Sequence, residues 1–103
     1  MLLGLRFGDV REFDSCRDFL DGMGAPTIGC LVLDIHMPDM SGFDLMQQLR
    51  EDGAPIPTIL VTGRTDASIR ARATELGAVA LLEKPVEYSD LLVAIERALE
   101  PGR

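Results

Sequence analysis

Residues 31–42 read Leu-Val-Leu-Asp-Ile-His-Met-Pro-Asp-Met-Ser-Gly, and this stretch decides the fold. An apolar run ends abruptly in one carboxylate, Asp34, a proline-containing turn follows, and Ser41 is placed to cap a helix. This order is typical of a buried strand that delivers one acid to the rim of a sheet. Ligands bind at the carboxyl ends of the strands in open parallel sheets. A carboxylate there can act as a base, a metal ligand or a nucleophile.

The same strand-then-helix pattern repeats along the chain. Apolar runs predict strands at 10–13, 30–33, 59–61 and 79–82, and apolar stripes with caps predict the helices between them. Ser15 and Ser41 are expected to cap the first two helices and Thr65 the third, and the last helix is expected at 88–99. Leu91, Leu92, Ile95, Ala98 and Leu99 would form the apolar face of that last helix. Four strand–helix repeats with short loops predict an α/β fold with a doubly wound parallel sheet.

The opening residues do not fit this pattern. Residues 1–5, Met-Leu-Leu-Gly-Leu, resemble the end of a helix that is already under way. A doubly wound domain would normally begin with its own buried strand.

Length and composition point to one ordinary globular domain. The chain has 103 residues, of which 47% are hydrophobic and 26% are charged. Its formal net charge of −7 argues against direct binding to nucleic acid or to an anionic membrane. The two cysteines, Cys16 and Cys30, lack metal-type spacing and favour a reducing compartment, so we expect a cytoplasmic protein. No apolar run is long enough to span a membrane.

Three polar residues follow three successive predicted strands: Asp34, Thr62 and Lys84. All three would lie at the same edge of the sheet, where they offer an anion, a hydroxyl and a cation. This set suits transfer of a phosphoryl group onto Asp34, because phosphoryl transfer needs mainly positioning and charge stabilisation. Taken singly, each residue has a plain structural explanation as a turn cap, a backbone partner or a solvated loop residue. Their coincidence on three strands favours a site.

These motifs resemble those of the receiver domains of bacterial two-component response regulators. The stretch around Asp34 is similar to the family's phosphoacceptor motif, Ile-Leu-Val-Thr-Gly-Arg to its hydroxyl-bearing strand end, and Leu-Leu-Glu-Lys-Pro-Val to its lysine–proline loop. The resemblance covers nearly the whole chain. It implies a flavodoxin-like receiver fold with sheet order 2-1-3-4-5.

The resemblance also implies roles for individual residues. Asp34 would be the phosphoacceptor, Thr62 the switch hydroxyl with Gly63 leaving room for it, and Lys84 the partner of the phosphoryl group. The Lys84–Pro85 peptide bond would be cis. The metal would be Mg²⁺, held by Asp34 and the backbone carbonyl of His36.

The sequence departs from the family pattern at its start. The receiver's central first strand and the acid pair that follows it have no counterpart, so we expect a single receiver-like domain over 1–103 that is truncated at its amino terminus and carries no output domain. The gap could be filled by residues 10–13 sliding across, by residues 1–7 becoming extended, or by a strand from a second chain, which leaves a homodimer open. Asp14 would then be the nearest acid to Asp34 and could partly replace the missing metal ligands, although the affinity for Mg²⁺ is in doubt. A second departure is Leu81, which stands where many receivers carry an aromatic switch residue.

The leading hypothesis is phosphorelay signalling, in which a sensor histidine kinase donates a phosphoryl group to Asp34. A downstream regulator or output protein would then contact the last two helices and the last strand. The chain would be a signalling module and not an enzyme that acts on a separate metabolite. The alternative is a phosphorylation-incompetent pseudo-receiver that acts only as an interaction module. A third reading is a small phosphatase with Asp34 as nucleophile, but His36 stands where haloacid-type phosphatases place a second acid.

Overall fold

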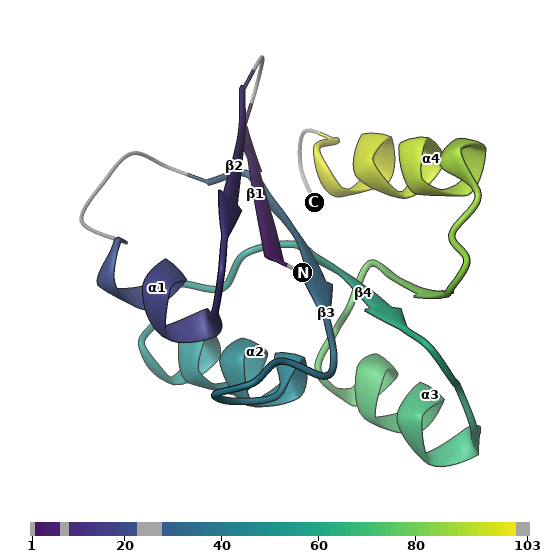
Figure 1. Ribbon diagram of the computed structural model, residues 1–103, viewed down its shortest axis with the longest axis horizontal. Coiled ribbons are helices and arrows are strands. Elements are labelled where there is room, and N and C mark those ends of the chain that lie inside the picture. The colour runs from purple at the N-terminus through teal and green to yellow at the C-terminus, as the bar shows by residue number, and fades with distance from the viewer. Residues whose placement is uncertain (1, 7–8, 23–27, 101–103) are drawn as a thin grey trace.

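The computed structural model describes residues 2–6, 9–22 and 28–100. In this part of the chain a five-stranded sheet carries helices on both faces (Figure 1). In chain order the elements are β1 (Leu2–Arg6), β2 (Asp9–Phe13), α1 (Cys16–Asp21), β3 (Cys30–Asp34), α2 (Gly42–Glu51), β4 (Thr58–Thr62), α3 (Ala67–Glu75), β5 (Ala80–Glu83) and α4 (Tyr88–Ala98). The predicted α/β class is confirmed, and every strand and helix predicted from the repeats is present within a few residues of its expected bounds.

The centre of the sheet corrects three predictions. The strand order is β2-β1-β3-β4-β5, so β1 lies between β2 and β3 and pairs antiparallel with both. Residues 2–6 are therefore a strand and not the end of a helix, and the sheet is mixed and not wholly parallel. The fold does not lack a central strand, because β1 occupies that position. Of the three arrangements considered for the gap, the structure shows the extended segment over residues 2–6, and residues 1 and 7 of that prediction lie outside the described residues.

β1 takes this central position because the facing edges of β2 and β3 need hydrogen-bond partners. A buried backbone N–H or C=O group without a partner costs about 1–3 kcal/mol, and a central strand satisfies such groups on both sides. β1 also has the period-two pattern that this position needs. Leu2 packs into the core on one face of the sheet, whereas Leu3 and Leu5 pack on the other.

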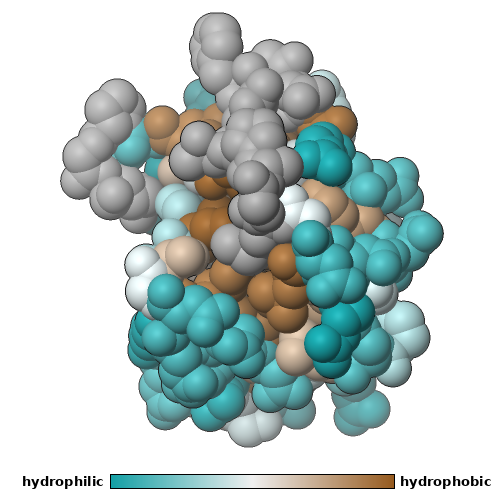
Figure 2. Space-filling view, turned by 90° about the vertical axis from the view of Figure 1, so that its left-hand side faces the viewer, coloured by the Kyte–Doolittle hydropathy of each residue, from teal (hydrophilic) through white to brown (hydrophobic). Residues whose placement is uncertain are grey.

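The core has two layers, one on each face of the sheet. α1, α2 and α3 cover one face and α4 covers the other, as Figure 1 shows. β3 and β4 are buried along their whole length, as expected for strands that are covered on both sides. Figure 2 shows the side of the molecule that carries α1 and β2, where apolar residues gather in the middle and hydrophilic residues frame them.

The helix ends follow the sequence with one exception. The Ser15 hydroxyl accepts from the Asp18 N–H and the Ser41 hydroxyl from the Asp44 N–H, which confirms both caps. The third helix is capped by Asp66, whose carboxylate accepts from the Ile69 N–H at 2.9 Å, and not by Thr65. An aspartate one position later makes the same bond with a charged acceptor, which is the stronger of the two.

The apolar face of α4 is also corrected. Ala94 and Ala98 are buried against the sheet, and Leu91 and Ile95 are half-buried beside them. Leu92 and Leu99 are exposed by 39% and 42%, so they do not belong to the buried face as predicted. None of the helices in the described ranges is long and apolar enough to cross a membrane.

Candidate functional site

Three strand ends bring the predicted residues to one edge of the sheet. In the register of the parallel strands Asp34 lies opposite Val61, and Thr62 lies opposite Glu83. Two backbone hydrogen bonds continue the ladder beyond the strands, from Ile35 N to Val61 O (2.9 Å) and from Lys84 N to Thr62 O (2.8 Å). The backbones that carry Asp34, Thr62 and Lys84 are thus locked together by the sheet itself.

Asp34 and Lys84 form an ion pair. The Lys84 ammonium donates to the Asp34 carboxylate through Oδ2. Asp34 is buried, whereas about half of the Lys84 side chain is exposed, so the cation reaches the acid from the solvent side. Burial alone would raise the pKa of Asp34, but the hydrogen bond from Lys84, the bond from the His36 N–H and the charge of Lys84 outweigh it and hold the pKa below its ordinary value. Asp34 is therefore a carboxylate at neutral pH.

The turn after β3 orients that carboxylate. The backbone N–H of His36 donates to Asp34 Oδ1 at 3.1 Å, while the His36 residue itself is exposed. The two oxygens of Asp34 thus have distinct partners, a backbone N–H on one and an ammonium on the other.

Thr62 lies at the same edge, but its hydroxyl is held locally. Thr62 Oγ1 donates to the carbonyl oxygen of Arg64 (2.8 Å) and accepts from the Arg64 N–H (3.3 Å), and the residue is fully buried. Gly63 has open space where a side chain would begin. A move of this hydroxyl toward Asp34 would have to break a bond within the loop, so the switch roles of Thr62 and Gly63 stay predictions.

The start of α2 rests directly on the strand that carries Asp34. The Gly42 N–H donates to the Ile35 carbonyl oxygen at 2.7 Å. A Cβ atom at Gly42 would lie 3.0 Å from the Asp34 carbonyl oxygen and 3.1 Å from Ile35 Cα, closer than side chains normally approach backbone. The absence of a side chain at Gly42 is what lets α2 pack this close to Asp34.

One residue of this loop has a part that sequence reasoning missed. The Asp39 carboxylate accepts from the Arg17 N–H (2.7 Å) and the Cys16 N–H (3.3 Å), so it ties the Asp34 loop to the first turn of α1. Although desolvation raises the pKa of Asp39, these backbone hydrogen bonds lower it further than desolvation raises it. No local signal could have revealed this contact, because its partners lie more than twenty residues earlier in the chain.

The Lys84–Pro85 peptide bond is cis, as the resemblance implied. Next to it, the Glu83 carboxylate accepts from the Thr65 N–H at 3.2 Å, which ties the loop after β4 to the end of β5.

Magnesium, the metal that receiver domains use, prefers several oxygen ligands in an octahedral arrangement. Within residues 2–6, 9–22 and 28–100, no group of three or more His, Cys, Asp or Glu side chains could hold a metal ion. Leu2 is paired with both Phe13 and Leu33, so one strand separates Asp14 from Asp34, and their backbones lie about 10 Å apart. The described residues therefore offer no cluster of three such side chains around Asp34, and the metal roles of Asp34, His36 and Asp14 stay predictions.

The arrangement can be compared with known proteins. The family model described as "Response regulator receiver domain" matches residues 2–96. The chain belongs to the response regulator receiver domain family. The transcriptional regulatory protein TdiR of Thauera aromatica is 43% identical over 95 residues, which cover 92% of this chain and 42% of that protein. FixJ of Rhizobium meliloti is 44% identical over 91 residues, which cover 88% and 45% of the two chains.

Solved structures agree with this assignment. The structure of FixJ-N is similar with a TM-score of 0.78 at 38% identity, covering 88% of this chain and 73% of that one. The response regulator StyR gives a TM-score of 0.76 at 41% identity, covering 84% and 44%. This receiver spans less than half the length of the curated relatives it matches. Its class is that of signalling modules of two-component systems, and such receivers typically use Mg²⁺ for phosphorylation.

Proposed function

We propose that this receiver accepts a phosphoryl group on Asp34 from a sensor histidine kinase and signals through protein–protein contact. The observation that carries the proposal is the buried, ionised Asp34 carboxylate with Lys84 and the Thr62 strand end beside it. A nucleophilic carboxylate must be ionised and must have compensation for the negative charge that the phosphoryl group brings. Lys84 supplies that charge.

In the proposed step an oxygen of Asp34 attacks the phosphorus of a phosphohistidine. A P–O bond forms, the P–N bond breaks, and the imidazole nitrogen leaves with the electron pair. The Lys84 ammonium then shifts from the carboxylate to the phosphoryl oxygens, and the Thr62 hydroxyl exchanges its bond to Arg64 for one to the same oxygens. Water later attacks the acyl phosphate, which releases inorganic phosphate and restores the carboxylate.

The test uses a small phosphodonor so that it does not depend on the identity of the kinase. The chain is incubated with phosphoramidate, with and without Mg²⁺, and intact mass is recorded. We expect a gain of one phosphoryl group that is lost in Asp34→Asn and kept in Asp44→Asn, a matched change at an exposed aspartate of α2. Wild-type protein that stays unmodified, or Asp34→Asn protein that is modified equally, overturns the proposal. Backbone amide shifts on adding beryllium fluoride give a second readout near Thr62 and Lys84.

The second candidate is a receiver that does not turn over phosphate and acts only as an interaction module. The observation that favours it is the lack of a metal-binding group of carboxylates among the described residues. It predicts that Mg²⁺ gives no saturable amide shifts in either wild type or Asp34→Asn. The phosphoacceptor proposal predicts shifts that weaken in Asp34→Asn, so the same titration separates the two.

A further inference from the structure

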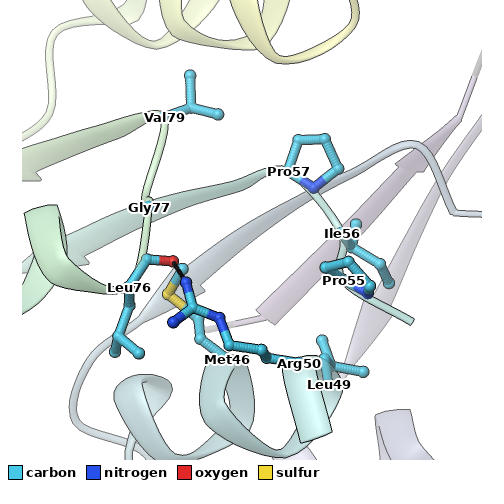
Figure 3. Close-up of a pocket in the computed structure, with 9 residues that line it drawn as sticks. All are labelled: Met46, Leu49, Arg50, Pro55, Ile56, Pro57, Leu76, Gly77 and Val79. Carbon is cyan, nitrogen blue, oxygen red and sulfur yellow. Dashed lines mark hydrogen bonds between the residues drawn. The ribbon is translucent and has the colours of Figure 1, made fainter. Parts of the chain in front are cut away.

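A hollow of about 330 Å³ lies at the other edge of the sheet from Asp34. The proposed phosphoryl transfer does not involve this hollow. Pro57 and Val79 come just before the amino ends of β4 and β5, whereas Asp34 and Thr62 stand at carboxyl ends. Figure 3 shows Pro55, Ile56 and Pro57 on one side of the hollow, and on another side Arg50 with its hydrogen bond to Leu76. Its lining residues are Met46, Leu49, Arg50, Pro55, Ile56, Pro57, Leu76, Gly77 and Val79.

The walls of this hollow are apolar and held in place. Met46, Leu49 and Leu76 belong to the core behind it, and all three are buried. Pro55 and Pro57 have backbones fixed by their rings. Gly77, at a φ of 77°, has no side chain to fill the space, and a Cβ built there would lie 3.8 Å from Arg50 Nη2. The hollow is therefore formed without a ligand.

The single charged group of the lining is the Arg50 guanidinium. One of its N–H groups, on Nη2, donates to the Leu76 carbonyl oxygen at 3.0 Å, which orients the planar fork beside the hollow. A guanidinium carries five N–H donors, so this bond leaves others to offer. The neighbouring acids Glu51 and Asp52 accept from Gln47 and Gln48 instead, and none of the described carboxylates pairs with Arg50.

We propose that this hollow is a binding site for a small organic acid with a compact apolar body and one carboxylate. The apolar body would lie against Ile56, Leu76 and Val79, and the carboxylate would accept a forked pair of hydrogen bonds from Arg50. Guanidinium and carboxylate match in this geometry, which is the reason arginine recognises such groups. The volume stands at the lower end of the range for small-molecule sites, about 300–1,000 Å³, so a single-ring or short-chain acid fits and a nucleotide does not.

The experiment is an NMR titration of the full chain with benzoate, with benzamide as the neutral match of the same shape. We expect saturable amide shifts at Met46, Ile56, Leu76, Gly77 and Val79 with a Kd of about 1 mM or tighter. Benzamide should bind at least about tenfold more weakly, because it lacks the charge that Arg50 recognises. No saturable shift at these residues, or equal binding of the two probes, overturns the inference.

Variants of the exposed arginines separate the site from general charge. Arg50→Gln should weaken benzoate binding at least about tenfold, whereas Arg97→Gln, which removes one positive charge from α4, should leave it unchanged. Arg50→Lys keeps the charge but loses the fork, so its affinity should lie between wild type and Arg50→Gln. Equal affinity in Arg50→Gln and wild type refutes the site. None of these variants touches Asp34, so phosphoramidate labelling reports on the phosphoacceptor proposal separately.

Discussion

Substitution of Gly42 by alanine tests the contact between α2 and the strand that carries Asp34. The added Cβ would lie 3.0 Å from the Asp34 carbonyl oxygen, 3.1 Å from Ile35 Cα and 3.2 Å from Leu33 Cγ. Two of these atoms are backbone in or next to β3, which is held by hydrogen bonds on both sides. Relief therefore has to come from a shift of α2, and such a shift strains the 2.7 Å bond from the Gly42 N–H to Ile35 O.

The magnitude follows from two opposing effects. Forcing an extra methyl group into a packed site costs about 1–3 kcal/mol. Replacing glycine by alanine in a helix gains up to about 1 kcal/mol, and less at the first helical position. We expect Gly42→Ala to lower the free energy of unfolding by about 1–2 kcal/mol. With a urea m-value of about 1 kcal/mol/M for a chain of this size, the unfolding midpoint should fall by about 1–2 M.

The matched control is Gly63→Ala at the same edge of the sheet. Gly63 has no positive φ and no atom within 4 Å of its built Cβ, so alanine meets open space there. We expect its free energy of unfolding to stay within about 0.5 kcal/mol of wild type or to rise slightly, because alanine restricts the unfolded chain. Urea midpoints of the two variants that agree, or a Gly42→Ala protein as stable as wild type, would refute the close-packing argument.

Four further perturbations test the electrostatics of the fold. Because the pKa of Asp34 is lowered in the folded state, its ionised form stabilises the fold above about pH 4. This stabilisation is lost as the pH falls through the pKa of the folded state. The urea midpoint of Asp34→Asn should therefore depend less on pH between about 5 and 2 than that of the wild type. A double-mutant cycle of Asp34→Asn with Lys84→Met should give a coupling of about 1 kcal/mol or less, because Lys84 is half exposed, and zero coupling would contradict the ion pair. Burial raises the pKa of the Cys30 thiol to about 11, so its neutral form stabilises the fold below pH 9.0, and about 2 kcal/mol of this stability is lost by about pH 11. Cys30→Val should therefore show a flatter alkaline profile, and an unchanged slope would count against this. Asp39→Asn leaves one acceptor oxygen in place of two, so hydrogen exchange at the Arg17 amide should accelerate, and unaltered protection there would mean that the α1 contact is not made in solution.

Much of the fold could be predicted because its signals are local. β3 and β4 are short apolar runs that end in a polar residue, and such runs bounded by turn residues are typical of strands buried on both faces. The prediction that Asp34, Thr62 and Lys84 share one edge needed only the direction of three parallel strands. The register confirms it for their backbones.

The errors lie where tertiary packing selects among equal local signals. α4 is apolar at so many positions that several stripes satisfy helical periodicity. The small side chains of Ala94 and Ala98 face the sheet because they allow the helix to approach closely, and this leaves Leu92 and Leu99 exposed. Packing also fixes a detail on which the sequence made no prediction, because the Thr62 hydroxyl is bonded to the Arg64 carbonyl oxygen.

The direction of the central strand β1 decides which residues can reach Asp34. β1 runs antiparallel to β3, and Leu2, not Arg6, is the β1 residue paired with Leu33 beside Asp34. The carboxyl end of β1 therefore lies at the far edge, and the residue that this strand presents near Asp34 is a fully buried leucine. A parallel strand in the same place would bring its following residues to the site. The identified compensation for the Asp34 charge comes instead from Lys84 and the His36 N–H, so the chemistry of this edge depends on strand direction as much as on strand order.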